Sequence, residues 1–173
     1  KLCQSYSRQY GRDYRAVMPT NLYGPGDNYH PNNSHVVPGL ISRFHQAKID
    51  GSSEVEVWGT GTPRREFLFV DDMATACILV HNIERGLLCD NQGLFPSHIN
   101  IGSGAEITIA ELAALVQKVV GYRGKVVFNN SKPDGTMRKL LDTNILEKNG
   151  WFPETALLDG LTRSYCDFLD RKA

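Results

Sequence analysis

The alternation of helix-like and strand-like segments most limits how this chain can fold. Segments with apolar residues three or four positions apart predict helices, and short β-branched or aromatic runs predict strands. Such segments follow one another along all 173 residues, and glycine or proline separates most of them. This alternation favours an α/β chain in which helices cover a sheet.

Residue spacing also provides bounds for the expected elements. Helices are predicted over 2–10, 36–44, 71–80, 108–120, 143–148 and 157–169, and strands over 14–18, 54–58, 65–70, 98–101 and 125–128. Asp71 and Asp72 are expected to cap the helix that they open, because a carboxylate there can accept free N–H groups. Thr108 and Glu111 have the spacing of a capping box.

Two loops between these elements are rich in turn residues. Segment 59–63 holds two glycines and a proline between two strands, so it predicts a hairpin. Segment 19–26 follows a strand and is expected to be a turn. A strand that ends in a polar loop often faces a ligand.

Charge and cysteine spacing argue against several classes of protein. Nineteen Lys and Arg balance nineteen Asp and Glu, so no overall positive field draws nucleic acid or an anionic membrane. The four cysteines form no C-x-x-C pair, which argues against a zinc module and a secreted disulfide scaffold and favours a cytoplasmic protein. The apolar stretch 110–120 is broken by Glu111 and Gln117, short of the roughly 20 residues of a membrane span.

The segment Gly102-x-Gly104 lies between a strand and a helix, as the dinucleotide-binding fingerprint does. The third glycine is missing, since position 107 is Ile, and the capping box already satisfies the helix end. We therefore interpret the segment as a structural turn. The P-loop pattern G-x-x-x-x-G-K-[ST] is also missing from the sequence.

Individual polar residues leave the function open at this point. His35, beside Ser34, could act as an acid or base near neutral pH, although a lone histidine is more often structural. Trp58 could stack on a ligand ring or be buried. The same two interpretations, an anion clamp or a solvated face, apply to Arg43, Arg65, Arg138 and Lys139. Asp134 belongs first of all to a turn signal, Asp134-Gly135.

Three longer strings carry a specific resemblance. They are MPTNLYGPGDNYHPNNSHV at 18–36, VWGTGTPRREFLFVDDM at 57–73 and SKPDGTMRKLLD at 131–142. They closely resemble the GDP-L-fucose synthase family of epimerase-reductases, within the extended short-chain dehydrogenases/reductases. The resemblance covers essentially the whole chain and implies the C-terminal portion of such an enzyme.

The resemblance implies a two-step, NADP(H)-dependent conversion of GDP-4-keto-6-deoxy-D-mannose to GDP-L-fucose. Sugar carbons 3 and 5 are epimerised first, and the 4-ketone is then reduced by NADPH. One site can serve both steps, because the ketone acidifies the neighbouring C–H bonds and is itself the hydride acceptor.

The resemblance also implies roles for particular residues. His35 would donate a proton during epimerisation and lie against the nicotinamide. The other residues that would line the cofactor near this end are Pro19, Thr20, Asn21 and Leu22. Arg43, Trp58 and Arg65 would hold the GDP-sugar, and Asp134 would contact a sugar or ribose hydroxyl. No metal site is implied.

The same resemblance predicts parts of two domains. Residues 1–22 and 66–102 would complete an NADP-binding Rossmann-type doubly wound sheet, and 23–65 and 103–173 would form a smaller α/β substrate domain. The helix with Tyr6 and Tyr10 would pack across a homodimer. The family's glycine-rich cofactor loop and its catalytic Ser, Cys and Tyr-x-x-x-Lys groups would precede residue 1, so the 173-residue chain alone is expected to be inactive.

Two alternatives stay open. One is another nucleotide-sugar epimerase or dehydratase of the same superfamily, which shares segments like that at 65–72. The other is a binding module without catalysis. The segment Asn33-Ser34-His35 favours the GDP-L-fucose synthase family over the other epimerases. Titration with GDP would separate part of an enzyme from a self-sufficient binding module.

Overall fold

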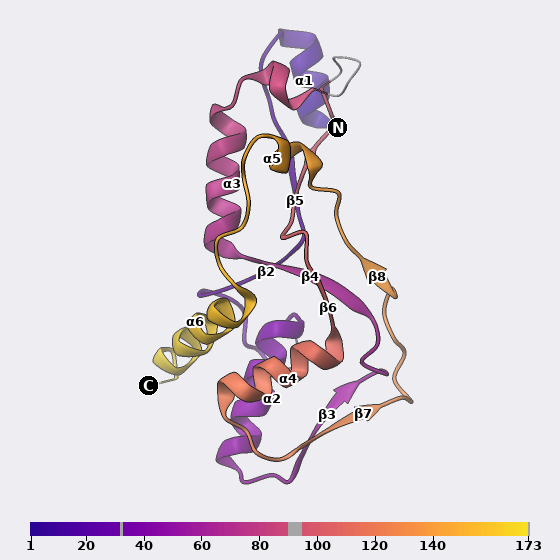
Figure 1. Cartoon of the computed structure of the whole chain (residues 1–173), viewed down its shortest axis with the longest axis vertical. Helices are drawn as coiled ribbons and strands as arrows, with labels where there is room; N and C mark the ends of the chain where they lie inside the picture. Colours follow the sequence, from indigo (N-terminus) through magenta and orange to yellow (C-terminus); the bar gives the residue numbers. More distant parts are fainter. Residues whose placement is uncertain (32, 90–94, 173) are drawn as a thin grey trace.

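A computed structural model describes residues 1–31, 33–89 and 95–172 of the chain. It confirms the α/β class: helices and mostly parallel strands alternate along the chain. Figure 1 shows an elongated arrangement with helix α1 (Leu2–Tyr10) at one end and strands β3 (Glu54–Trp58) and β7 (Lys125–Asn129) at the other. None of the helices in these ranges is long and apolar enough to cross a membrane.

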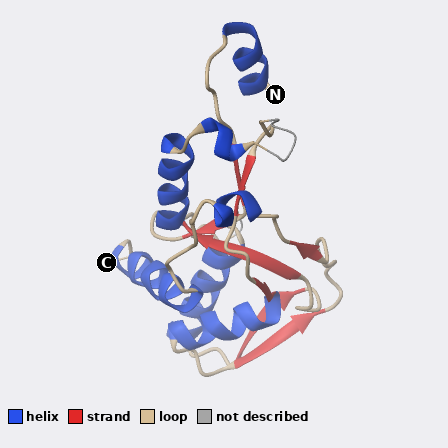
Figure 2. Ribbon diagram, turned by 45° about the horizontal axis from the view of Figure 1, so that its top comes forward, coloured by secondary structure: helices blue, strands red, loops and turns tan. Residues whose placement is uncertain are grey.

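The β3–β7 lobe contains these two parallel strands and three helices. The helices are α2 (Val36–Ile49), α4 (Ile109–Val120) and α6 (Leu157–Asp170). Figure 2 shows them gathered on one side of the strands, where their apolar faces meet. The fully buried centre of this lobe includes Leu40, Ile41, Phe44, Leu112, Val116 and Leu161.

The β1–β5 lobe contains the parallel pair β1 (Val17–Pro19) and β5 (Ile99–Ile101). Around it lie α1, α3 (Val70–Asn82), the short 3-10 helix η1 (Arg85–Leu88) and α5 (Asn144–Lys148). Its buried core includes Val80, Leu88, Ile99, Ile101, Leu146 and Trp151. Helix α1 contributes no buried residue to it.

Strand β4 (Arg64–Phe69) connects the two lobes. Its first half pairs with β6 (Glu106–Thr108) and β8 (Arg138–Lys139), and its second half pairs in parallel with β2 (Asn21–Tyr23). Because side chains alternate along a strand, Phe67 and Phe69 pack into the β3–β7 core and Leu68 into the β1–β5 core.

Several sequence predictions are confirmed. Helix α1 ends at Gly11 and α4 at Gly121, both with positive φ. Thr108 Oγ1 accepts the N–H of Glu111 at 3.1 Å, and Glu111 Oε2 accepts the N–H of Thr108 at 2.8 Å, which completes the capping box.

The predicted hairpin at 59–63 is wrong. Strand β3 pairs with β7 and not with β4, whose first half has β6 and β8 as its partners. Carbonyl oxygens of the turn accept N–H groups from the start of α4 instead, at 2.9 Å from Ala110 to Gly61 and 3.0 Å from Ile109 to Pro63. Turn residues indicated a change of direction, but they did not determine which strand would lie alongside.

Two other predictions need correction. Residues 19–26 are not simply a turn, because Pro19 ends β1 and Asn21–Tyr23 form β2. Asp71 and Asp72 do not cap α3, whose N-cap is Phe69 with no side-chain cap bond. Asp72 instead accepts N–H groups of the segment before α6, and Asp71 pairs with Arg163 on α6 at 2.7 Å.

Candidate functional site

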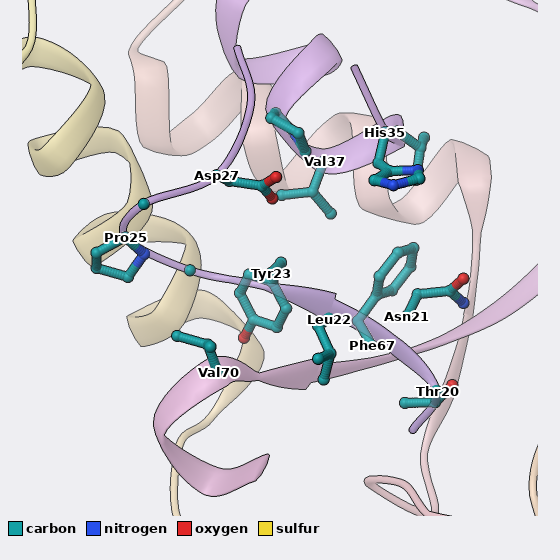
Figure 3. Close-up of a pocket in the computed structure, with 14 residues that line it drawn as sticks. Thr20, Asn21, Leu22, Tyr23, Pro25, Asp27, His35, Val37, Phe67 and Val70 are labelled. Carbon is teal, nitrogen blue, oxygen red and sulfur yellow. The ribbon is translucent and has the colours of Figure 1, made fainter. Parts of the chain in front are cut away.

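A cavity of about 430 Å³ lies between β2, the start of α2 and the end of β4. Figure 3 shows Asn21 and Phe67 on the strands and His35 and Val37 at the start of α2, arranged around it. The residues that line it are Thr20, Asn21, Leu22, Tyr23, Gly24, Pro25, Gly26, Asp27, His35, Val36, Val37, Pro38, Phe67 and Val70. The cavity therefore combines apolar and aromatic walls with a few polar groups, as small-molecule sites do.

His35 is the residue that precedes α2. Its main-chain oxygen accepts the N–H of Gly39 at 2.9 Å, while its side chain makes no capping bond and is exposed. The first turn of α2 is thus held by the backbone, and the imidazole is directed to the cavity (Figure 3). A histidine placed there can give or take a proton from a bound molecule.

The segment expected to line a cofactor contributes unequally to this cavity. Asn21 Nδ2 donates to the main-chain oxygen of Glu66 at 2.8 Å, and Thr20 Oγ1 donates to the same oxygen at 3.2 Å. Leu22 lines the cavity, but its side chain packs against the β1–β5 core. Pro19 lies in β1 beside Ile101 and is not among the lining residues.

Arg43 lies on α2 and reaches the neighbouring strand β3. Its Nε donates to Gly39 O and its Nη1 to Glu56 O, both at 3.2 Å. Burial lowers the pKa of the guanidinium, and Glu56 opposes that shift. Arg43 is not part of the cavity wall, although its helix begins at the cavity. Its guanidinium group lies beside β3, the strand that carries Trp58.

Trp58, Arg65 and Asp134 meet around the turn that follows β3. The Asp134 carboxylate accepts the N–H of Thr60 at 2.9 Å and its hydroxyl at 2.7 Å. A Cβ on Gly135 would lie 3.0 Å from Arg65 Nη2, so the arginine passes close to this loop. Lys132 from the same loop lies over the exposed Trp58 ring, 5.5 Å from its centre.

The structure thus forms two groups from the predicted residues. Thr20, Asn21, Leu22 and His35 share the cavity, and Trp58, Arg65 and Asp134 share the loop region. Strand β4 connects the groups, because Phe67 lines the cavity and Arg65 stands two residues before it on the same face, about 7 Å along the strand.

Three of the residues at this site that sequence reasoning missed bear on its chemistry. Phe67 and Asp27 line the cavity, and Glu66 holds Thr20 and Asn21 from behind. A carboxylate directly before the apolar run 67–69 of the same strand was the signal for Glu66, since such a group is buried only when it is hydrogen-bonded. Nothing in the local pattern distinguished Phe67 from an ordinary core aromatic.

The Gly102–Gly104 segment is consistent with the structural turn that we predicted. A Cβ on Gly102 would collide with the Glu66 carboxylate, and the N–H of Gly104 donates to Glu66 Oε1 at 2.8 Å. Within the described ranges, no group of three or more His, Cys, Asp or Glu could hold a metal ion.

Comparison with known proteins agrees with this geometry. Residues 1–102 match the model of the NAD dependent epimerase/dehydratase family. The chain is 56% identical over 172 residues to GDP-L-fucose synthase of Escherichia coli K12, covering 99% of this chain and 54% of that protein. It spans about half the length of the curated relatives it matches.

Two solved structures from Campylobacter jejuni are also similar. One, a GDP-6-OMe-4-keto-L-xylo-heptose reductase, is 33% identical with a TM-score of 0.88 and covers 98% of this chain and 57% of that one. The other, a GDP-mannoheptose C4 reductase with NADP bound, is 32% identical with a TM-score of 0.81 and covers 97% of this chain and 56% of that one. By sequence and fold, the chain belongs to the NAD dependent epimerase/dehydratase family and is homologous to the GDP-L-fucose synthases.

Proposed function

We propose that this chain forms the substrate-side part of an NADP(H)-dependent enzyme that converts GDP-4-keto-6-deoxy-D-mannose to GDP-L-fucose. The observation that carries the proposal is the position of His35, at a cavity whose opposite wall continues along β4 to Arg65. The homology to GDP-L-fucose synthases and the NADP bound by a similar reductase support it.

His35 is the proposed proton donor for epimerisation. Its imidazole is exposed to the cavity, where a sugar carbon next to the ketone would lie. Once a base has taken the proton from one face of that carbon to give the enolate, a general acid placed here protonates the carbon from the other face and inverts it. Epimerisation at carbons 3 and 5 then precedes reduction.

The cavity suits the nicotinamide end of the cofactor, which supplies a hydride to the ketone when bound. Phe67 offers a flat aromatic wall and Val37 an apolar one, and Asn21 offers an amide that Glu66 O already orients. Leu22 lines the cavity from the same segment, and Pro19 precedes that segment at the end of β1. These residues can hold a ring and exclude water from it.

Arg43, Trp58 and Arg65 are the proposed GDP-binding residues. The arginines would clamp the pyrophosphate with charge-assisted hydrogen bonds, and Trp58 is exposed enough to stack on a ring. Asp134 already accepts two hydrogen bonds from Thr60, and a carboxylate has further lone pairs for a sugar or ribose hydroxyl.

The proposed domain division assigns 1–22 and 66–102 to an NADP-binding domain and 23–65 and 103–173 to the substrate domain. Leu146 and Trp151 cross that division, since they pack in the core with Ile99 and Ile101. A homodimer through the exposed helix α1 belongs to the same proposal, and a cytoplasmic location stays a prediction.

Replacing His35 tests the function directly. In the whole protein, His35→Gln should slow exchange of solvent deuterium into sugar carbons 3 and 5 by about 10²- to 10⁴-fold, the usual contribution of a general acid. Reduction of an already epimerised ketone, followed by NADPH absorbance, should persist. The matched control His81→Gln changes an exposed histidine on α3 and should leave both steps intact. Equal loss of both steps in His35→Gln would count against the proton-donor role.

A second candidate is a ketone reductase without epimerase activity. The similar structure named a GDP-mannoheptose C4 reductase favours it. The same deuterium experiment separates the two candidates, because a reductase alone oxidises NADPH without incorporating deuterium at carbons 3 and 5. Binding of GDP without any turnover would instead indicate a non-catalytic binding module.

A further inference from the structure

Glu66 lies where β4 changes its partners. Arg64, Arg65 and Glu66 pair with β6, and the next residue, Phe67, begins the ladder with β2. Glu66 is therefore the junction between the strand segment that carries Arg65 and the segment that lines the cavity. It is also completely buried, at 0% exposure.

The Glu66 side chain is held by the backbone of two separate segments. Oε1 accepts the N–H of Gly104 at 2.8 Å, and Oε2 accepts the N–H of Leu141 at 3.2 Å. Across the described ranges, Glu66 takes part in no ion pair. A carboxylate buried in this way depends on its N–H donors, so each donor is fixed in place with it.

The Glu66 main chain holds the cavity wall. Its carbonyl oxygen accepts both Asn21 Nδ2 and Thr20 Oγ1. Leu141 lies two residues beyond Lys139, which is the β8 partner of Arg65. One residue thus joins the cavity-lining segment, the 102–104 turn and the strand beside Arg65.

We propose that Glu66 is a positioning residue that fixes the GDP-binding side of the site relative to the cavity where the sugar reacts. Its side chain anchors one face of β4, and the side chains of Arg65 and Phe67 lie on the opposite face of the same strand. The two ends of a nucleotide sugar must bind at once, so a shift along this strand would weaken binding of the whole ligand. This inference rests on the proposed function.

The variant Glu66→Gln tests the proposal with little change of shape. Glutamine keeps one acceptor oxygen but turns an NH₂ group toward a second N–H, so it cannot satisfy both Gly104 and Leu141. We expect the KM for the GDP-sugar and the Kd for GDP to rise about tenfold, the effect of one lost buried hydrogen bond. The kcat should change by less than about twofold, because no reacting group is altered.

Asp72→Asn is the matched control. Asp72 is also a buried carboxylate, at 5% exposure, and it accepts the N–H groups of Glu154 and Thr155 at 3.3 and 3.1 Å. These donors precede α6 and do not connect the two groups of site residues. The control should lower the melting temperature as Glu66→Gln does, without raising KM or Kd.

Steady-state kinetics with the GDP-sugar and calorimetric titration with GDP are run on the whole protein, well below the melting temperature of each variant. A rise in KM and Kd confined to Glu66→Gln supports the proposal, and equal values in both variants overturn it. Should Glu66→Gln not fold, Glu66→Asp takes its place, since it keeps the carboxylate but is one methylene too short for both donors. A wild-type protein that bound neither GDP nor NADP⁺ would overturn the proposed function itself, and this inference with it.

Discussion

The cationic side chains on the two faces of the β4–β8 ladder differ in their ion pairing. On one face, Arg64 and Arg138 both pair with Glu106, at 2.8 and 2.7 Å. On the other face, Arg65 and Lys139 are register partners, and neither forms an ion pair with a carboxylate in the described ranges. Neighbouring residues of identical charge type therefore have different electrostatic partners, because alternation along a strand directs them to opposite faces.

Under the proposed function, this difference gives a chain without net charge a local site for an anion. On the Glu106 face one carboxylate pairs with both arginines and offsets part of their charge, whereas the Arg65 face leaves two positive charges beside each other. Adjacent cations that are not paired with a carboxylate repel each other, so a bound phosphate would relieve that repulsion. The proposed function therefore places the pyrophosphate at the second face.

The largest effect on this comparison is expected from Arg65→Gln. It should raise the Kd for GDP about 10- to 100-fold, because charge-assisted hydrogen bonds to a phosphate are lost. The neighbouring variant Arg64→Gln serves as its control and should change the Kd for GDP by less than about threefold. Titration calorimetry on the whole protein measures both. Equal effects would show that the two faces do not differ in function.

A smaller effect is expected from Lys139→Gln. Lys139 is exposed, so its attraction to a bound phosphate is screened by water, and the Kd should rise only about two- to fivefold. The rise should shrink as salt increases from about 0.05 M to about 0.5 M. Lys118→Gln, on α4, is the control and should show no such change. A salt-independent effect would contradict an electrostatic role for Lys139.

The smallest expected effect concerns Glu106, on the face with the ion pairs, and depends on pH. Hydrogen bonds from Arg138 and Arg64 hold the pKa of Glu106 below its ordinary value of 4.5. A carboxyl whose pKa falls on folding stabilises the fold above its unfolded pKa, and that contribution disappears as pH falls through its folded pKa. The melting temperature of Glu106→Gln should thus lie slightly below that of wild type at pH 7, and the two should converge below pH 4.5. A difference that persisted at acid pH would exclude this origin.

Local chemistry predicted much of the fold. The glycine stops of α1 and α4, the capping box and the class of the chain all depend on residues close in sequence, and each is confirmed. The hairpin prediction failed because β3 and β4 pair with strands far away in the sequence, β7 and β6, which local turn residues do not specify. For the same reason, the sequence could not predict the partners of two carboxylates. Asp72 accepts hydrogen bonds from the segment before α6, and Asp71 pairs with Arg163.

The candidate site shows the same limit. His35, Asn21 and Arg65 could be named as candidates from residue type and resemblance, because imidazole, amide and guanidinium groups have known chemistry. Their spatial relation required β4, whose alternation directs Arg65 and Phe67 to one face and the Glu66 carboxylate to the other. The sequence by itself determined the class of fold and the chemical groups available. Only the tertiary structure decided which cations form ion pairs and which residues share a cavity, because pairing and burial bring together segments far apart in the chain.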